Sequence, residues 1–379
     1  MIYLDNSATT KPYPEVLESF RQVSTQFFAN PSSIHQFGGK TETLLTKARV
    51  QAASILNVKP NEIIFTSGGT EGNNMAIKGI ALEHQHRGKH IITTEIEHPS
   101  VYDTCKSLEK LGFEITYLPV NEEGIISLTD LKKAIRQDTI MISVMHVNNE
   151  LGSIQPIEEI GEVSKDYPKL FFHVDHVQGL GKVPLDFKKT GIDLCTMSGH
   201  KIHGLKGSGI IYIRQGTSIY PLLHGGGQEG EYRSGTENVA GSVSMVKALR
   251  MCKEKMHWHI EKMNNLKKHL RTELEKIDGV VVNTPVQGAP HLMNFSVPGL
   301  KPEVMIHSLG ESGIALSTKS ACSSKQLDES RVLSACGFSE RRSKSAFRVS
   351  MSYDTTKEDI TIFLKEFKKT VRQLKEVMG

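Results

Sequence analysis

The sequence is short of cysteine, and the cysteines it has show no pairing pattern. Its 379 residues contain five cysteines, an odd number, and no Cys-x-x-Cys pair. This spacing argues against a disulfide framework and against a structural zinc site. Unpaired cysteines are typical of the reducing cytoplasm, where we expect the protein. The first five residues show neither the basic nor the apolar segment of an export leader.

Charge of one sign is also scarce, and so are long apolar runs. The chain has 46 Lys+Arg and 42 Asp+Glu, a formal net charge of +4. This balance is too mild to predict direct binding to nucleic acid. No apolar run approaches the ~20 residues that a membrane-spanning helix needs, so we expect no membrane association. The length predicts two or three domains at roughly 100–200 residues each.

From residue 62 onward, short β-branched runs alternate with amphipathic stretches. Strands that alternate with helices imply right-handed crossovers and a mainly parallel sheet. The near-continuous apolar character of the runs indicates burial on both faces of that sheet. The sequence therefore predicts an α/β fold. The predicted strands are 63–66, 90–94, 114–118, 140–144 and 170–174, and the predicted helices include 128–135 and 157–163.

The pattern changes near Val239, where a long helical stretch without proline begins and runs to about Ile277. Beyond this connecting helix, short strands and helices mix. We predict a large domain of residues 16–255 and a smaller α+β domain made of residues 1–15 and 256–379. The later strands are predicted at 280–282, 292–297 and 347–351, and the later helices at 302–311, 327–335 and 356–376.

Three polar segments follow predicted strands and together suggest a cofactor site. The glycine-rich turn 67–71 precedes a helix, whose free N–H groups favour a phosphate, although a simple tight turn would look the same. Asp175 ends a central strand, where α/β sheets bind ligands. Lys201 lies in a Gly/Ser-rich loop between buried strands, where a lysine can form a Schiff base. A phosphate cradle, an acid and a lysine are the requirements of pyridoxal phosphate (PLP).

Eight segments spread over the whole chain resemble the NifS/IscS-type cysteine desulfurases, which are fold-type-I PLP enzymes of the aminotransferase class V superfamily. The resemblance implies the fold-type-I architecture, PLP as cofactor, L-cysteine as substrate and a homodimer. The segments are 3–10, 30–35, 66–71, 147–152, 173–175, 198–201, 233–238 and 320–322.

The resemblance also implies a role for each matching residue. Lys201 matches the lysine that binds PLP covalently, and Asp175 matches the acid that keeps the pyridine nitrogen protonated. His98 matches the histidine that stacks on the ring and can act as an acid or base. Arg348 matches the arginine that forks onto the substrate carboxylate. The remaining matches are Asn149 and Gln178 near the phenolic oxygen and the substrate, Gly69, Thr70, Ser198 and His200 in the phosphate cup, and Thr236, which reaches the phosphate of the neighbouring subunit.

The same resemblance implies that Cys322 is the nucleophile that takes sulfur from the substrate as a persulfide and leaves alanine. Ser-Ala-Cys occurs a second time at 334–336, but Cys336 ends a predicted helix, whereas polar flanks place Cys322 in a predicted loop. Pairs of nearby histidines lack convergent further ligands, so we expect no metal. The three other cysteines, which we expect to be buried and inert, are Cys105, Cys195 and Cys252.

The sulfur would pass to an acceptor protein, either an iron–sulfur scaffold or a tRNA-thiolating enzyme. A selenocysteine lyase and a non-catalytic sulfur-relay scaffold are the alternatives. The sequence departs from the family pattern at three places, one of them 350–352, which lacks the glycine usually found soon after the arginine strand. His176 follows Asp175 where a small residue is common, and it either alters the cofactor pocket or faces away from it. Lys319 replaces a glycine before Ser-Ala-Cys, where its charge would lower the pKa of the thiol.

Overall fold

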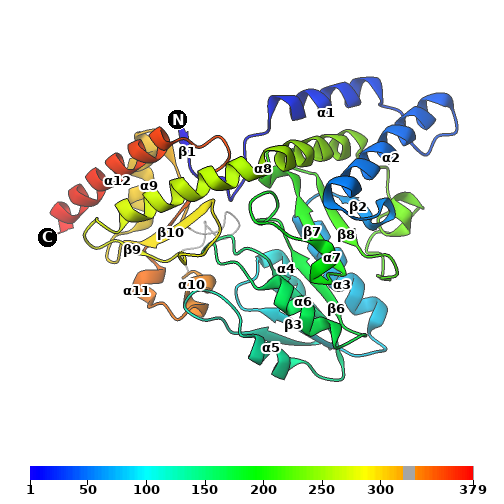
Figure 1. Ribbon diagram of the computed structural model, residues 1–379, viewed down its shortest axis with the longest axis horizontal. Coiled ribbons are helices and arrows are strands. Elements are labelled where there is room, and N and C mark those ends of the chain that lie inside the picture. The colour runs from blue at the N-terminus through cyan, green and yellow to red at the C-terminus, as the bar shows by residue number, and fades with distance from the viewer. Residues whose placement is uncertain (319–328, 379) are drawn as a thin grey trace.

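The computed structural model describes residues 1–318 and 329–378. Seven strands form its central sheet (Figure 1), in the spatial order β2-β8-β7-β6-β5-β3-β4. All neighbouring strands run parallel except β8, which is antiparallel to β2 and to β7. The predicted α/β fold with a mainly parallel sheet is confirmed. The strands are β2 (Ile63–Thr66), β3 (His90–Thr94), β4 (Glu114–Leu118), β5 (Thr139–Met145), β6 (Phe171–Asp175), β7 (Leu194–Ser198) and β8 (Gly209–Ile213).

Helices cover both faces of this sheet. Successive residues of a strand point to opposite faces, so Ile63 packs in the hydrophobic cluster that contains Met245, whereas Ile64 packs in the cluster that contains Met75. Both faces are therefore buried, as the near-continuous apolar strands predict. The covering helices are α3 (Gly69–His84), α4 (Pro99–Glu109), α5 (Leu128–Ala134), α6 (Ile157–Lys165) and α7 (Phe187–Thr190).

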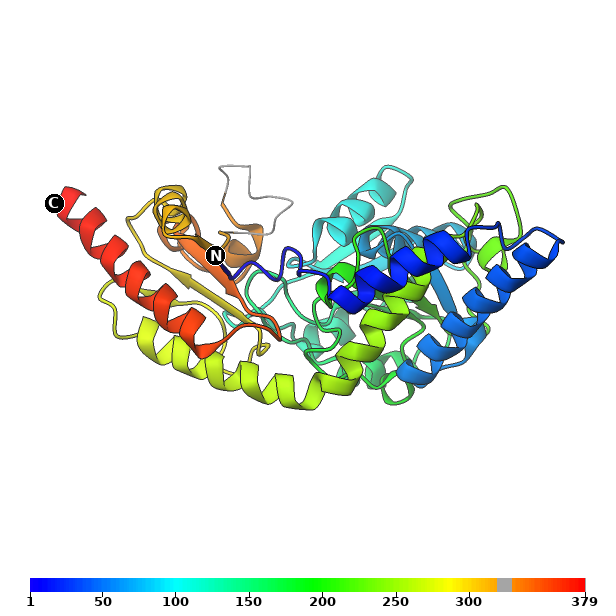
Figure 2. The same cartoon turned by 90° about the horizontal axis from the view of Figure 1, so that it is seen from above.

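One long helix, α8 (Val239–Leu274), connects this layer to the rest of the molecule (Figure 2). Its 36 residues make it ~54 Å long at about 1.5 Å per residue. The Asn238 side chain caps its start by accepting a hydrogen bond from the Gly241 N–H at 2.9 Å. The beginning of α8 packs against α1 (Pro14–Gln26) and α2 (Gln36–Leu56), and its end packs in a second hydrophobic core. The predicted connecting helix is thus present.

The smaller part is built on an antiparallel sheet in the order β12-β10-β9, which pairs β12 (Ala346–Ser350), β10 (Leu292–Ser296) and β9 (Val281–Val282). Phe295, Phe347 and Phe367 stack edge to face or face to face in its core. The N-terminal strand β1 (Ile2–Tyr3) joins it through a parallel pairing with β11 (Ile314–Ala315). Its helices are α9 (Pro302–Glu311), α10 (Arg331–Ala335), α11 (Glu340–Ser343) and α12 (Lys357–Met378).

Two of the predicted boundaries need comment. The helix predicted at 327–335 begins at Arg331, because the Ser330 hydroxyl caps it by accepting from the Leu333 N–H at 3.3 Å. Residues 327 and 328 lie outside the described part. The domain boundary at 255 falls within α8, which continues through it, and the division into two domains stays a proposal. Within the described ranges, no helix is long and apolar enough to cross a bilayer.

Candidate active site

A cavity of about 170 Å³ lies at the carboxyl ends of β5, β6 and β7. The sheet register aligns these ends, because it pairs Met145 with Asp175 and Asp175 with Thr196. Ligands of open α/β sheets bind at this edge. The smaller part of the molecule contributes one wall residue from β12. Of the predicted site residues, the cavity is lined by Gly69, Thr70, His98, Asn149, Asp175, Gln178, Ser198, His200, Lys201 and Arg348.

Asp175 is a buried acid, and among the described residues its hydrogen bonds come from neutral donors. Its carboxylate accepts from the Asn73 side-chain amide at 2.8 Å and from the Val177 N–H at 3.0 Å. Burial raises the pKa of Asp175, against the opposing effect of these hydrogen bonds and of the charge on Lys201. A ligand that brings a positively charged N–H to this carboxylate would therefore be held strongly.

A chain of hydrogen bonds links Asp175 to His98. The Asn73 amide donates to Asp175 and also to the Ser100 hydroxyl at 2.8 Å, and that hydroxyl lies 2.8 Å from Nδ1 of His98. His98 caps α4, with Nδ1 accepting from the Ser100 N–H. Burial and the charges of Lys201 and Arg331 lower the pKa of His98 to about 4. The ring is therefore neutral and carries its proton on Nε2.

Asn73 and Ser100 line the cavity, and the sequence interpretation missed both of them. Ser100 was detectable, since it follows His98-Pro99 at the start of a helix where a capping hydroxyl is common. Asn73 has no local signal, because its partners come from β6 and α4.

Lys201 is the last residue of a 3₁₀ turn, η2 (Gly199–Lys201), that directly follows β7. Its ammonium donates to the main-chain carbonyls of Ser7 at 2.5 Å and Ala8 at 2.8 Å, so the N-terminal arm forms the roof over this lysine. Gly199 is required for close packing, since a Cβ there would lie 2.6 Å from Ser208 Oγ and 2.8 Å from Met245 Sδ. Packing against Ser208 and Met245 therefore holds the loop that carries Lys201 in place.

Part of the cavity lining has the donors of an anion site. Gly69 and Thr70 begin α3, a helix of 16 residues whose first N–H groups have no intrahelical acceptor. A Cβ on Gly69 would lie 2.9 Å from Val177 Cγ2, so the backbone approaches this edge closely only because residue 69 is glycine. Ser198 and His200 add a hydroxyl and an imidazole. Helix N-termini with such side chains bind phosphates.

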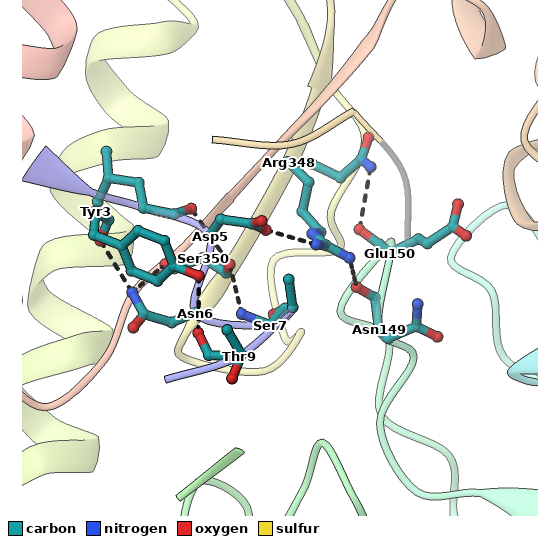
Figure 3. Close-up of polar contacts among 12 residues, drawn as sticks. Tyr3, Asp5, Asn6, Ser7, Thr9, Asn149, Glu150, Arg348 and Ser350 are labelled. Carbon is teal, nitrogen blue, oxygen red and sulfur yellow. Dashed lines mark hydrogen bonds and ion pairs between the residues drawn. The ribbon is translucent and has the colours of Figure 1, made fainter. Parts of the chain in front are cut away.

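Arg348 lies on β12 and is 1% exposed (Figure 3). Its guanidinium forms an ion pair with Asp5 at 2.8 Å and donates to the Asn149 carbonyl oxygen at 2.9 Å. Among the residues that the structure describes, its buried Nε has no hydrogen-bond partner. Asp5, which sequence reasoning missed, therefore orients an arginine that retains an unused donor beside the cavity.

The model of one protein family covers nearly the whole chain: the family described as "Aminotransferase class-V" matches residues 2–363. The chain belongs to the aminotransferase class-V family. The predicted resemblance to NifS/IscS-type cysteine desulfurases, and with it the fold and the enzyme class, is confirmed by the relatives that follow.

A protein from Dictyoglomus turgidum named "Cysteine desulfurase IscS" is 45% identical over 99% of this chain and 96% of its own length. A solved structure titled "NIFS-LIKE PROTEIN" superposes with a TM-score of 0.93 at 36% identity, covering 98% of this chain and 99% of that one. A second, titled "SspA in complex with cysteine", has a TM-score of 0.81 at 34% identity and covers 93% and 99% of the two chains. That protein's title reports a complex with cysteine.

One described residue that the resemblance assigns to the site, Thr236, does not line this cavity. Thr236 lines a separate cavity of about 140 Å³ together with Glu229 and Arg233. Its predicted contact with the phosphate of a neighbouring subunit is not tested by a single chain. Cys322 and Lys319 fall among residues 319–328, outside the described part, and their assignments stay predictions.

The other four cysteines are buried, as predicted for Cys105, Cys195 and Cys252. Burial raises the pKa of Cys105 and of Cys336 to about 12, and it raises the pKa values of Cys195 and Cys252 as well. Thiols with such pKa values carry little thiolate and are poor nucleophiles. None of these four positions therefore competes with Cys322 on chemical grounds.

His176 faces away from the cofactor cavity. Of the two expectations for this departure from the family pattern, an altered pocket or a side chain that points elsewhere, the structure shows the second. Its Nδ1 lies 2.8 Å from Nδ1 of His146, and the two rings stack with their centroids 4.9 Å apart. Burial lowers the pKa values of both histidines, that of His146 to about 4. The ring of His176 lines a different cavity, next to Cys252, behind the strand that carries Asp175.

Proposed function

We propose that this class-V enzyme binds PLP in the cavity around Lys201 and Asp175 and takes sulfur from L-cysteine, leaving alanine and a persulfide on Cys322. One observation supports this most strongly. A lysine, a buried acid, the start of a helix and an arginine come from four distant parts of the chain and meet at one cavity. An amino-acid substrate with a PLP cofactor needs this combination of groups.

The residues present fit PLP. Asp175 is a buried acceptor with a raised pKa, and a protonated pyridine nitrogen would add a positively charged donor to the neutral donors that the described residues supply. The start of α3, with Ser198 and His200, suits the phosphate, and neutral His98 suits the face of a ring. When bound, PLP supplies an electron sink that stabilises negative charge on the substrate's α-carbon.

The chain's own residues would supply the proton transfers and the binding. Arg348 holds the substrate carboxylate with its guanidinium, which lines the cavity. Lys201 removes the α-proton with its amine, and neutral His98 can donate from Nε2. The Cys322 thiolate attacks the substrate sulfur, so an S–S bond forms while the C–S bond breaks. The C–S electron pair stays on carbon, which is protonated and leaves as alanine.

We further propose a homodimer in which Thr236 reaches the partner's phosphate. Two observations support this. Thr236 lines a separate cavity and not the cofactor cavity of the same subunit, and three large apolar side chains of one segment are exposed. Phe28, Ile34 and Phe37 are 78%, 107% and 62% exposed, which is unusual for a surface that stays in water. The sulfur acceptor is proposed to be a protein, with an iron–sulfur scaffold and a tRNA-thiolating enzyme both open. The cytoplasmic location stays a prediction.

We expect Asp175→Asn to keep the cofactor but to lower kcat by on the order of 10²-fold, because an amide no longer stabilises a protonated ring nitrogen. Steady-state alanine formation measures this. Asp193→Asn is the matched control. Asp193 is a partly buried acid, with its carboxylate 2.8 Å from the Phe172 N–H and 3.2 Å from Arg214. It lies outside the cavity lining and should affect stability only. Equal losses of kcat in both variants would contradict the role of Asp175.

We expect Arg348→Lys to lower kcat/KM for L-cysteine mainly through a higher KM. An ammonium keeps the positive charge but cannot form the two parallel hydrogen bonds that a guanidinium makes to a carboxylate. A hydrogen bond to a charged group contributes about 1.5–3 kcal/mol, or roughly 10- to 100-fold. Arg342→Lys is the control. Arg342 donates a hydrogen bond of 2.7 Å to the Asn283 side chain, and this pair lies away from the cavity. An unchanged KM in Arg348→Lys, in protein with wild-type thermal unfolding, would remove Arg348 from the substrate site.

The activity itself is tested with PLP-loaded protein and L-cysteine, by measuring alanine together with protein-bound persulfide. The two alternatives give different results. A selenocysteine lyase would turn over selenocysteine at least as fast and would be indifferent to replacement of Cys322. A non-catalytic scaffold would not bind PLP.

A further inference from the structure

Lys182 is a buried lysine that the proposed mechanism does not use. It lies on the turn that follows Asp175, in which the Leu180 N–H donates to the His176 carbonyl and the Lys182 N–H donates to the Gly179 carbonyl. Its side chain is 5% exposed, and within the described ranges no carboxylate lies within ion-pair distance of it. A buried ammonium without a carboxylate is costly. Its position therefore needs a reason.

The hydrogen bond of Lys182 points to that reason. Its Nζ donates to the main-chain carbonyl oxygen of Lys201 at 2.9 Å. The preceding carbonyl, that of His200, is held from the other side by the N–H and the hydroxyl of Thr10, both at 2.9 Å. The N-terminal arm and the turn after β6 thus clamp two successive carbonyls of η2. Lys182 ties the segment of the cofactor acid directly to the segment of the cofactor lysine.

The groups that face Lys182 offer it no negative charge. They are imidazoles, a thiol and a phenol, and burial favours the neutral form of each. Burial also lowers the pKa of Lys182 itself, to about 8. The imidazoles and the thiol are those of His176, His200, His203, His291 and Cys252. The phenol is that of Tyr353, whose hydroxyl donates to the carbonyl oxygen of Gly181, the residue before Lys182.

We propose that Lys182 is a positioning residue for Lys201: its hydrogen bond to the Lys201 carbonyl fixes the main chain from which the Lys201 amine reaches the cofactor. This inference rests on the proposed function, because the group that Lys201 would bind is PLP. The amine of a lysine swings through four methylene groups, so main-chain freedom adds directly to the disorder of its Nζ. If the Lys201 amine is held less accurately against the cofactor, the reaction rate can fall by up to roughly 100-fold.

The test is Lys182→Met in PLP-loaded protein, since methionine fills the space but cannot donate. We expect kcat for L-cysteine to fall about 10-fold with KM unchanged, because Arg348 and its wall of the cavity are untouched. The pH midpoint of the visible absorption band should rise by about one pH unit, since a cation behind Lys201 is lost. Thermal unfolding should change little, because the cost of a buried ammonium disappears together with its hydrogen bond.

Lys267→Met is the matched control. Lys267 is also a lysine that is 5% exposed, and burial lowers its pKa to about 8. It donates to the carbonyl oxygens of Pro285, Val286 and Gly288, none of which lines the cofactor cavity. Its replacement should leave kcat and the absorption midpoint at their wild-type values.

The outcomes separate the two claims. Wild-type kcat and midpoint in Lys182→Met would overturn the positioning role while the proposed function stands. Wild-type protein without a visible cofactor band would overturn the proposed function itself. If Lys182→Met does not fold, Lys182→Leu is measured against the same expectations: a lowered kcat with a raised midpoint supports the role, and wild-type values refute it.

Discussion

Lys201→Ala should purify without a covalently bound cofactor and should lose L-cysteine turnover by roughly 10³-fold or more, since one amine serves both as the attachment point and as the base. Of the described residues, Lys201 is the lysine that lines the cavity. Added PLP can still bind through the start of α3 and Asp175, so the variant should take it up without the covalent link. The absorption spectrum, and the protein mass after borohydride reduction, measure both effects.

Lys206→Ala is the control for this result. Lys206 lies five positions further along the same loop, is exposed and does not line the cavity. Its replacement should leave the reduced, cofactor-labelled mass intact. A label that survives in Lys201→Ala and disappears in another lysine variant would move the covalent site and contradict the assignment.

Cys322→Ser should abolish protein-bound persulfide and lower alanine formation by at least roughly 10³-fold, because a hydroxyl does not take sulfur from the substrate. The cofactor spectrum should stay that of the wild type, since the described residues proposed to hold the cofactor, Lys201 and Asp175 among them, are unchanged. Alanine quantified by chromatography and persulfide quantified by alkylation measure the two effects separately. Undiminished activity on selenocysteine alone would favour the selenocysteine lyase.

Cys336→Ser tests the specificity of that effect, because it replaces the cysteine of the second Ser-Ala-Cys. Cys336 is 2% exposed and packs with Val332 and Leu333. A buried hydroxyl there should lower the free energy of unfolding by about 1–3 kcal/mol while persulfide still forms. Loss of persulfide in Cys336→Ser but not in Cys322→Ser would exchange the roles of the two cysteines.

The sequence predicts this site well where a residue's role follows from its immediate surroundings. Asp175 is recognisable because an acid ends an apolar strand, and Lys201 because a lysine follows another such strand in a glycine-rich loop. The strands themselves carry a strong local pattern, since both faces of the sheet are buried and most strand residues are apolar. The family motifs then add the residues whose types alone say little, such as Asn149 and Gln178.

The contacts that orient these residues are not predictable in the same way. Asp5 forms an ion pair with Arg348, which lies 343 positions away in the chain. No local sequence pattern near either residue predicts this pair. Asn73 connects to Asp175 across 102 positions. Lys182 reads as an ordinary loop lysine until the fold places it against the Lys201 carbonyl. Such partners depend on how the sheet, the helices and the N-terminal arm close around one point, which local periodicity does not encode.

The most direct test of the central claim is to incubate PLP-loaded wild-type protein with a slight excess of L-cysteine and to map the product by peptide mass spectrometry. The account predicts one added sulfur atom on the peptide that contains Cys322, with alanine formed in equal amount. Alanine without protein-bound sulfur, or a sulfur atom added at Cys105, Cys195, Cys252 or Cys336, would contradict it.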